Sequence, residues 1–212
     1  FLYSYPETID EDLIKVVREN KKVCKYFDIP IQHISDNVLK RMNRKSNGKS
    51  IENLIKKLRK EIPDVIIRTT VMVGFPGETA EDYEELYKFV EKTKFDKMGA
   101  FSYSKEENTP AEKLKEQIHP ATKKSRYNKI MQLQQKVVEQ NIIKHIGKEL
   151  EVLIENNTFD EKYYIGRSYM QAPEIDEVIY IKNTKQLEIG QFIKCKIIDT
   201  KGYDLIGEIV NN

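Results

Sequence analysis

The sequence contains no tryptophan and only two cysteines, Cys24 and Cys195, which lie far apart in the chain. So few thiols exclude a disulfide framework and a metal site built on clustered cysteines. Because free cysteine behaves as a small buried hydrophobe, we expect both thiols to be reduced and packed. No apolar run approaches the roughly 20 residues that a membrane-spanning helix requires, and the start of the chain lacks the pattern of a secretory signal peptide. We therefore expect a soluble, cytoplasmic protein with no membrane partner.

An excess of one charge sign is also absent. The 36 Lys+Arg residues nearly balance the 34 Asp+Glu residues, which gives a net charge of +2 over 212 residues. This balance excludes attraction of the whole molecule to nucleic acid or anionic lipid, so any such affinity must be local. With 39% hydrophobic and 33% charged residues, the chain is no disordered tail; it suits one large domain, or a medium domain plus a small one.

Up to about residue 146, the apolar residues follow strand and helix periodicities in turn. Strands are predicted over 1–5, 26–32, 65–74 and 95–104, helices after the caps Thr8, Ser35, Ser50 and Thr79, and a long polar helix over 120–146. The run 65–74 is β-branched and almost wholly apolar, as in a strand buried on both faces of a parallel sheet. Four strands are too few to close a (β/α)8 barrel, so we predict an α/β fold with about half of such a barrel. Because the chain starts at Phe1, inside a predicted strand, we expect a piece of a longer protein.

From residue 147 the pattern changes to short alternating strands. They are predicted over 150–154, around Tyr164, and over 178–181, 192–198 and 205–210. Strands of this length and spacing are typical of a small antiparallel β-barrel, closed or nearly closed. We therefore predict two domains, residues 1–146 and 147–212.

The sharpest local motif is Gly-Phe-Pro-Gly-Glu at residues 74–78. Gly74 and Gly77 let the backbone approach a ligand closely, and a helix N-terminus with free N–H groups follows. The alternative is a plain tight turn between a strand and a helix. In barrels of this kind ligands lie at the carboxyl ends of the strands, which selects residues 32–35, 74–78 and 102–104.

Further polar residues lie on the same strands. Arg68 and Thr70 alternate along one strand and are predicted to point to one face, with Thr69 on the other. Arg68 could pair with a carboxylate of a ligand or form a structural ion pair. Gln32 and His33 end the preceding strand, where His33 is either a ligand-facing group or a hydrogen-bonded core residue.

Charge is concentrated locally. Residues 40–61 hold nine Lys or Arg against two Glu, which fits a solvated helix face or an RNA-facing patch. Residues 146–212 hold eight Lys or Arg against twelve Asp or Glu, so the predicted barrel is acidic. An acidic barrel suits a basic protein better than RNA, because RNA phosphates require positive charge. The candidate substrate-binding residues on it are Arg167, Glu174, Asp176 and Glu177, with scattered charge for solubility as the alternative.

Three runs resemble the radical-SAM methylthiotransferases: residues 28–36 (DIPIQHISD), 38–44 (VLKRMNR) and 68–79 (RTTVMVGFPGET). The end of the chain resembles a TRAM domain, and its runs 166–168, 172–176 and 203–207 resemble the RimO branch. The sister MiaB branch typically has Gln-Ser where this chain has Gln32-His33. The resemblance covers essentially the whole chain and implies the C-terminal part of a radical-SAM core followed by a substrate-recognising TRAM domain.

The resemblance also implies a function. The RimO branch attaches a methylthio group to the β-carbon of an aspartate in ribosomal protein S-twelve. The family uses S-adenosylmethionine (SAM) and two [4Fe-4S] clusters, each held by three cysteines; this chain carries neither cysteine set, so we expect it to be inactive by itself, with no catalytic or metal-binding residue. By the resemblance, the cofactor-binding candidates are Gln32, Ser35, Arg68, Thr70, Val73, Gly74, Phe75 and Glu78, with Val73 and Gly74 contacting adenine through their backbone.

Two alternatives stay open. One is the MiaB-type enzyme that modifies adenosine in tRNA, for which a basic barrel is expected, so a tRNA partner is less favoured than a protein. The other is a non-catalytic RNA-binding module, for which Tyr163, Tyr164, Tyr169 and Tyr180 would supply stacking surfaces. Half a barrel would also leave an open sheet edge, which predicts a homodimer as a consequence of truncation.

Overall fold

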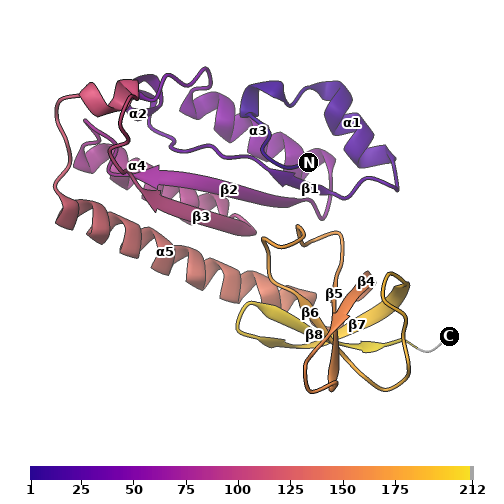
Figure 1. Ribbon diagram of the computed structural model, residues 1–212. Helices are drawn as coiled ribbons and strands as arrows, with labels where there is room; N and C mark the ends of the chain where they lie inside the picture. The colour runs from indigo at the N-terminus through magenta and orange to yellow at the C-terminus, as the bar shows by residue number, and fades with distance from the viewer. Residues whose placement is uncertain (211–212) are drawn as a thin grey trace. The chain divides into compact units, whose positions relative to one another are not determined.

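The computed structural model describes residues 1–210. The chain divides into two compact units, Phe1–Val137 and Val138–Asn212, drawn in indigo to pink and in orange to yellow in Figure 1. The long helix α5 (Pro120–Ile142) crosses this division, whereas the sequence places the domain boundary after residue 146. Among the described residues, no helix is both long enough and apolar enough to cross a membrane.

The first unit is built on a three-stranded parallel sheet. Strands β1 (Tyr26–Asp28), β2 (Ile66–Val73) and β3 (Lys97–Ser102) pair in the order β1-β2-β3. Its other elements are η1 (Pro6–Thr8), α1 (Glu11–Glu19), α2 (Asp36–Arg41), α3 (Gly48–Glu61), α4 (Ala80–Thr93), η2 (Pro110–Lys113) and most of α5. The alternation of strand and helix confirms the α/β fold class.

One face of this sheet forms the core of the unit. The fully buried side chains of β2 pack in one cluster with apolar residues of α1, α3, α4 and α5: Ile67, Val71, Val73, Val17, Leu58, Leu86 and Ile130. On the other face Arg68, Thr70 and Met72 are half-buried. The alternation of Arg68 and Thr70 is thus as predicted, but β2 is fully buried on one face only, because the four helices pack on that face.

Two helices begin with a capping box. α4 begins after Thr79, which forms the predicted box with Asp82. α3 begins earlier than predicted, because Asn47 is its N-cap and Ser50 is the reciprocal partner in the first turn. In both cases side-chain oxygens satisfy backbone N–H groups that have no acceptor within the helix.

Of the two other predicted caps, Thr8 is wrong, and Ser35 is the N-cap residue as predicted but caps without its side chain. Thr8 donates its hydroxyl to the Tyr5 carbonyl, and Asp10 caps α1 instead by accepting the N–H of Leu13 at 2.9 Å. Ser35 precedes α2 as predicted, but its side chain makes no capping hydrogen bond. Its hydroxyl has a partner on another helix, which the sequence pattern could not indicate.

The strand predicted over 26–32 is shorter in the structure. β1 ends at Asp28, and beyond it only an isolated bridge joins Gln32 to Val71. Pro30 lies between them and has no N–H to donate to a ladder.

Residues 1–5 do not form the predicted strand, so the sheet has three strands rather than four. They still run beside β1, since the Phe1 carbonyl accepts the N–H of Asp28 at 2.9 Å. The helix predicted over 120–146 ends at Ile142 and is followed by the turn η3 (Ile143–His145).

The second unit is a closed five-stranded barrel, as predicted. Its strands are β4 (Glu149–Asn157), β5 (Tyr163–Arg167), β6 (Ile179–Lys182), β7 (Phe192–Lys201) and β8 (Asp204–Ile209), closed in the order β4-β5-β6-β8-β7. One pair departs from the predicted antiparallel pattern: β8 pairs in parallel with β6, because it inserts between β6 and β7. The fully buried interior consists of Val152, Ile154, Ile179, Ile181, Cys195 and Ile197.

The two cysteines lie in different environments. Cys195 is buried inside the barrel, which raises its pKa to about 12. Cys24 is exposed in the loop between α1 and β1, so the expectation that both thiols are packed is wrong for Cys24. In this loop the neighbouring Val23 packs against the core, and Cys24 remains on the surface, where connecting segments usually run.

Gly166→Ala is expected to destabilise the barrel by about 1–3 kcal/mol, because a well-packed core accepts no extra atom. An added Cβ would lie 2.5 Å from the Leu153 carbonyl oxygen and 2.7 Å from Val152 Cγ1. The matched control is Gly99→Ala on β3, where the nearest atom is Thr70 Oγ1 at 4.0 Å. Chemical denaturation followed by circular dichroism measures both variants, and equal losses of stability would contradict the packing argument.

Candidate functional site

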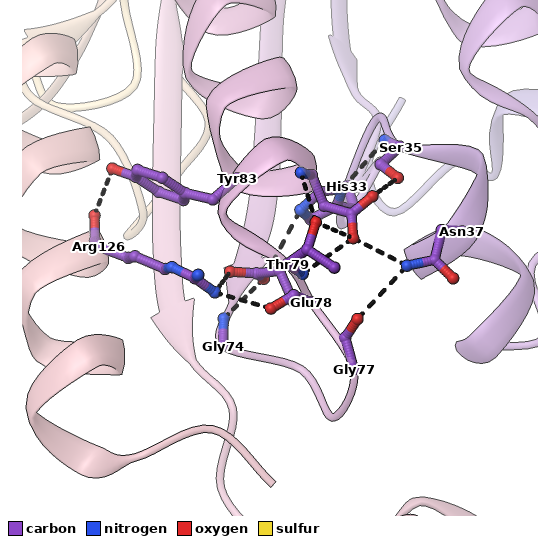
Figure 2. A network of polar contacts seen from close by, with 10 residues as sticks. His33, Ser35, Asn37, Gly74, Gly77, Glu78, Thr79, Tyr83 and Arg126 are labelled. Carbon is purple, nitrogen blue, oxygen red and sulfur yellow. Dashed lines mark hydrogen bonds and ion pairs between the residues drawn. The ribbon is translucent and has the colours of Figure 1, made fainter. Parts of the chain in front are cut away.

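Two loops meet at the carboxyl ends of β1 and β2, where Figure 2 shows their polar side chains pointing toward one another. In the first loop Gln32 has a φ of 65°. Its N–H donates to the Thr70 carbonyl at 2.9 Å, and its own carbonyl accepts the N–H of Met72 at 2.7 Å. A left-handed residue other than glycine costs about 1–3 kcal/mol, and these two bonds to β2 hold Gln32 in that conformation.

In the second loop Glu78 fixes the turn that precedes α4. Its side chain is fully buried; Oε2 accepts the N–H of Gly74 at 2.7 Å, and Oε1 pairs with the guanidinium of Arg126 on α5. Gly74 and Gly77 have φ values of 74° and 82°, a conformation that glycine adopts without strain. Burial raises the pKa of Glu78, although Arg126 and the Gly74 N–H oppose the change.

Asp82, in the first turn of α4, joins the two loops. Its Oδ1 accepts the hydroxyl of Ser35, and its Oδ2 accepts Asn37 Nδ2 at 2.8 Å and the N–H of Thr79 at 2.9 Å. Burial would raise the pKa of Asp82, but these hydrogen bonds outweigh it and lower the pKa to about 2. Asn37 also reaches the Gly77 carbonyl at 3.4 Å, so α2 and the turn are held together.

His33 lies beneath both loops with no exposed surface. Its Nδ1 accepts the N–H of Ser35 at 3.0 Å, so in the neutral ring the proton is on Nε2. Nε2 faces Glu78 Oε2 at 3.6 Å and has no hydrogen-bond partner among the described residues. Burial lowers the pKa of His33 to about 4, so the ring is neutral at pH 7.

The structure gathers most of the predicted cofactor residues at this edge of the sheet: Gln32, Ser35, Val73, Gly74, Phe75 and Glu78. Thr70 and Arg68 lie further back along β2, on its half-buried face. Arg68 donates to Asp28 Oδ2 at 3.0 Å, which is the structural ion pair that the sequence left open. The ring of Phe75 packs edge-on against Tyr103 with centroids 5.1 Å apart, so its side chain belongs to an apolar cluster.

The predicted substrate-binding residues all lie in the barrel unit. Arg167 Nε donates to Glu155 Oε1 at 2.6 Å, so this arginine has a partner on the neighbouring strand. Glu174 has a φ of 61°, and Asp176 accepts the N–H of Ala172 at 2.8 Å, inside the loop that also carries Glu177. Asp176 therefore stabilises the conformation of this loop as well as giving it negative charge.

Residues 1–210 contain no group of three or more His, Cys, Asp or Glu side chains that could hold a metal ion. The cysteines lie in different units, one exposed and one buried. An iron–sulfur cluster needs several converging thiolates, so the residues of this chain do not fit such a cluster.

Four residues of the site escaped the sequence analysis as functional candidates: Asn37, Asp82, Lys123 and Arg126. Asp82 was visible as the partner of Thr79 in a capping box, yet no sequence pattern indicates its contact with Ser35. Lys123 and Arg126 come from α5, more than 40 residues after the turn they contact. No spacing rule reaches so far along the chain.

His33→Asn is expected to change how stability depends on pH. The unfolded ring has a pKa of 6.5 and the folded ring about 4, so the folded state favours the neutral ring. The stability that His33 supplies is complete above pH 6.5 and is lost as the pH falls toward 4, by about 1.4 kcal/mol per pH unit. Denaturation midpoints at pH 7.5 and pH 5 measure this loss in the wild type, in His33→Asn and in the exposed control His119→Asn. A wild-type loss that persists unchanged in His33→Asn would contradict the assignment.

Comparisons with known proteins agree with this geometry. Residues 1–90 match the radical SAM superfamily, and residues 146–210 match the TRAM domain. Among solved structures, coproporphyrinogen III oxidase (HemN) from Escherichia coli, a radical SAM enzyme, has a TM-score of 0.55 over 79% of this chain and 44% of that chain. Its sequence identity is 14%, so it shows the fold alone.

Curated relatives are much closer in sequence. The ribosomal protein uS12 methylthiotransferase RimO of Alkaliphilus oremlandii is 62% identical over 99% of this chain and 48% of the relative. Those of Acetivibrio thermocellus and Clostridioides difficile are each 47% identical over 99% of this chain. The chain spans about half the length of the curated relatives it matches. These matches show what the chain is similar to: radical SAM proteins over residues 1–90, TRAM domains over residues 146–210, and the RimO relatives over 99% of its length.

Proposed function

We propose that this chain is part of a radical-SAM methylthiotransferase that adds a methylthio group to an aspartate of ribosomal protein uS12. In this proposal the first unit contributes to binding SAM and the barrel contributes to binding the protein substrate. The observation that carries it is the buried network of Glu78, Asp82 and His33, which fixes two loops at the carboxyl ends of parallel strands. This end of such sheets is where ligands bind. A substrate on the ribosome also implies a cytoplasmic location.

The candidate cofactor residues of the first unit fall into those that could contact SAM and those that hold the loops. Val73 and Gly74 stay the candidates for the adenine base, since Gly74 has no side chain and a positive φ, although the Lys123 stem lies against Gly74. Gln32 and Thr70 remain candidates for the ribose and methionine parts. Ser35 and Glu78 support the proposal differently, because their side chains already bind Asp82, Gly74 and Arg126; we assign them to holding the loops rather than touching the cofactor.

SAM would supply the radical chemistry of the reaction. The two [4Fe-4S] clusters that the family uses would have to be held by residues outside this chain, because Cys24 and Cys195 cannot bring thiolates together. The part of this chain is therefore to bind and orient, and we expect no turnover from the chain alone. Arg68, paired with Asp28, is a lower-ranking cofactor candidate for the same reason as Ser35.

The charge distribution of the barrel supports a protein partner. Opposite charges stand face to face on β4 and β7, with Glu149 opposite Lys196 and Glu151 opposite Lys194. Such cross-strand pairs neutralise one another, so the acidic excess lies in the loops, among Glu174, Asp176 and Glu177. Loops of one charge sign attract a basic protein and speed its encounter.

An RNA partner has one observation in its favour. Tyr163 and Tyr180 pack edge to face with centroids 6.0 Å apart, and Lys201 Nζ lies 5.8 Å from the centroid of the Tyr180 ring. Aromatic rings beside a cation are typical of surfaces that stack nucleic-acid bases. The tRNA-modifying enzyme and a non-catalytic RNA-binding module are therefore the second candidates.

Glu78→Gln is expected to weaken SAM binding about tenfold, because it removes the charge that holds Arg126 and loosens the Gly74 turn. The matched control is Glu84→Gln on the same helix, where the exposed carboxylate pairs with the exposed Lys88. Isothermal titration with SAM measures both variants, and thermal melting checks that they remain folded. Equal affinity in wild type, Glu78→Gln and Glu84→Gln would refute this part of the proposal.

Titration of the chain with purified ribosomal protein uS12 and with bulk tRNA, each at two salt concentrations, tests the partner. We expect tight binding to the protein that weakens with salt, since the attraction is electrostatic. Preference for tRNA with a steep salt dependence would move the assignment to the RNA-modifying candidates.

A further inference from the structure

Lys123 and Tyr103 lie beside the turn at residues 74–78. Tyr103 directly follows β3, and its N–H donates to the Val73 carbonyl at 2.9 Å. Lys123 Nζ donates to the Tyr103 carbonyl at 3.0 Å and lies 4.7 Å from the centroid of the Tyr103 ring. The lysine stem passes over Gly74, where an added Cβ would lie 2.5 Å from Lys123 Cγ. Both side chains are thus placed at the carboxyl ends of β2 and β3.

The hydroxyl of Tyr103 has no hydrogen-bond partner among residues 1–210, although the residue is only 7% exposed. A buried hydroxyl without a partner costs about 1–3 kcal/mol, so proteins rarely keep one without a use for it. Phenylalanine would fill the same space beside Phe75 without that cost. The hydroxyl therefore points to a group that binds there.

The ammonium of Lys123 also has fewer partners than it can bind. In the described part of the chain no carboxylate lies within ion-pair distance of it, and its one hydrogen bond goes to the Tyr103 carbonyl. Partial burial lowers the pKa of Lys123, although the attraction of the Glu78 carboxylate opposes this change. Arg126, its neighbour on α5, differs because Glu78 pairs with it.

The position of Lys123 in α5 goes against the usual rule for helices. The first turns of α1, α2 and α4 carry acidic residues, whereas those of α3 and α5 carry none, and α5 has Lys123, Lys124 and Arg126 near its start. Cations near a helix N-terminus are disfavoured by the helix dipole. A nearby anion offsets this cost; Glu78 supplies one for Arg126, and Lys123 has no such ion-pair partner in the described part of the chain.

We propose that Lys123 and the Tyr103 hydroxyl together bind a carboxylate group at the ends of β2 and β3. A carboxylate has two oxygens, which can accept from an ammonium and a hydroxyl at once. The assignment of a source rests on the proposed function, which brings two carboxylates to this edge: the methionyl group of SAM and the side chain of the target aspartate. Ala111 and Leu114 pack against Phe75 and Tyr103, so the segment after β3 must shift to admit the group.

The first test uses this chain and a simple carboxylate. The probe is N-acetylaspartate amide, added to isotopically labelled chain while the NMR signals of the Gly74 and Tyr103 amides and of the lysine ammonium groups are followed. We expect saturable shifts that weaken about tenfold or more in Lys123→Met and in Tyr103→Phe, as for loss of a hydrogen bond to a charged group. The matched control is Lys124→Met, an exposed lysine on the same helix turn, which should behave as the wild type.

Tyr103→Phe separates binding from folding. Since it removes only an unmatched hydroxyl, its thermal midpoint should equal or exceed that of the wild type, while its binding of the probe falls. If the probe causes no shifts, or causes the same shifts in Lys123→Met and Tyr103→Phe as in the wild type, the proposal is wrong.

The second test distinguishes the two sources. SAM is compared with decarboxylated SAM, and a uS12 peptide with its Asp→Asn form, each against wild type and Lys123→Met. If the carboxylate comes from SAM, the wild type binds decarboxylated SAM more weakly than SAM, and Lys123→Met binds both equally. If it comes from the target aspartate, the wild type binds the Asp→Asn peptide more weakly than the uS12 peptide, and Lys123→Met binds both peptides equally. A chain that binds the simple carboxylate through these residues but neither SAM nor the peptide keeps this inference and overturns the proposed function.

Discussion

The arrangement of the first unit depends on one buried carboxylate. Glu78 has no exposed side-chain surface, and an ionised group in such a place is stable only when its partners satisfy it. Two partners satisfy its oxygens, the Gly74 N–H from the turn itself and the Arg126 guanidinium from α5. The neutral His33 ring from the loop after β1 lies 3.6 Å from the same carboxylate. Satisfying one charge therefore fixes a helix and a turn relative to one another, and the loop packs against them.

The same constraint explains what the sequence could reveal and what it could not. The turn at residues 74–78 and the capping box of Thr79 and Asp82 were predictable, because each is set by residues within a few positions of one another. The barrel was also predictable, since period-two alternation and turn residues are local signals. The contacts of Ser35 with Asp82 and of Arg126 with Glu78 join residues more than 40 positions apart. Only the folded sheet brings them together, so their roles had to come from the structure.

Boundary errors have the same origin. The sequence predicts Ser50 as the cap of α3, whereas in the structure Asn47 is the N-cap and Ser50, at the third position of the helix, accepts the N–H of Asn47. Both residues are common N-caps, so the sequence pattern allows either start. The start at Asn47 is accompanied by a contact with α2, since the Gly48 N–H donates to Asp36 at 2.7 Å, and such a contact between elements is not visible in a local pattern.

The order of strands in the barrel has a consequence for how this unit is made. β8 lies between β6 and β7 and is the last barrel strand in the chain. Until β8 has left the ribosome, β6 and β7 each keep an unpaired edge, and such edges attract other strands. The barrel can therefore close only after β8 has been made, and until then the lysines on β6 and β7 oppose the pairing of these open edges with other strands.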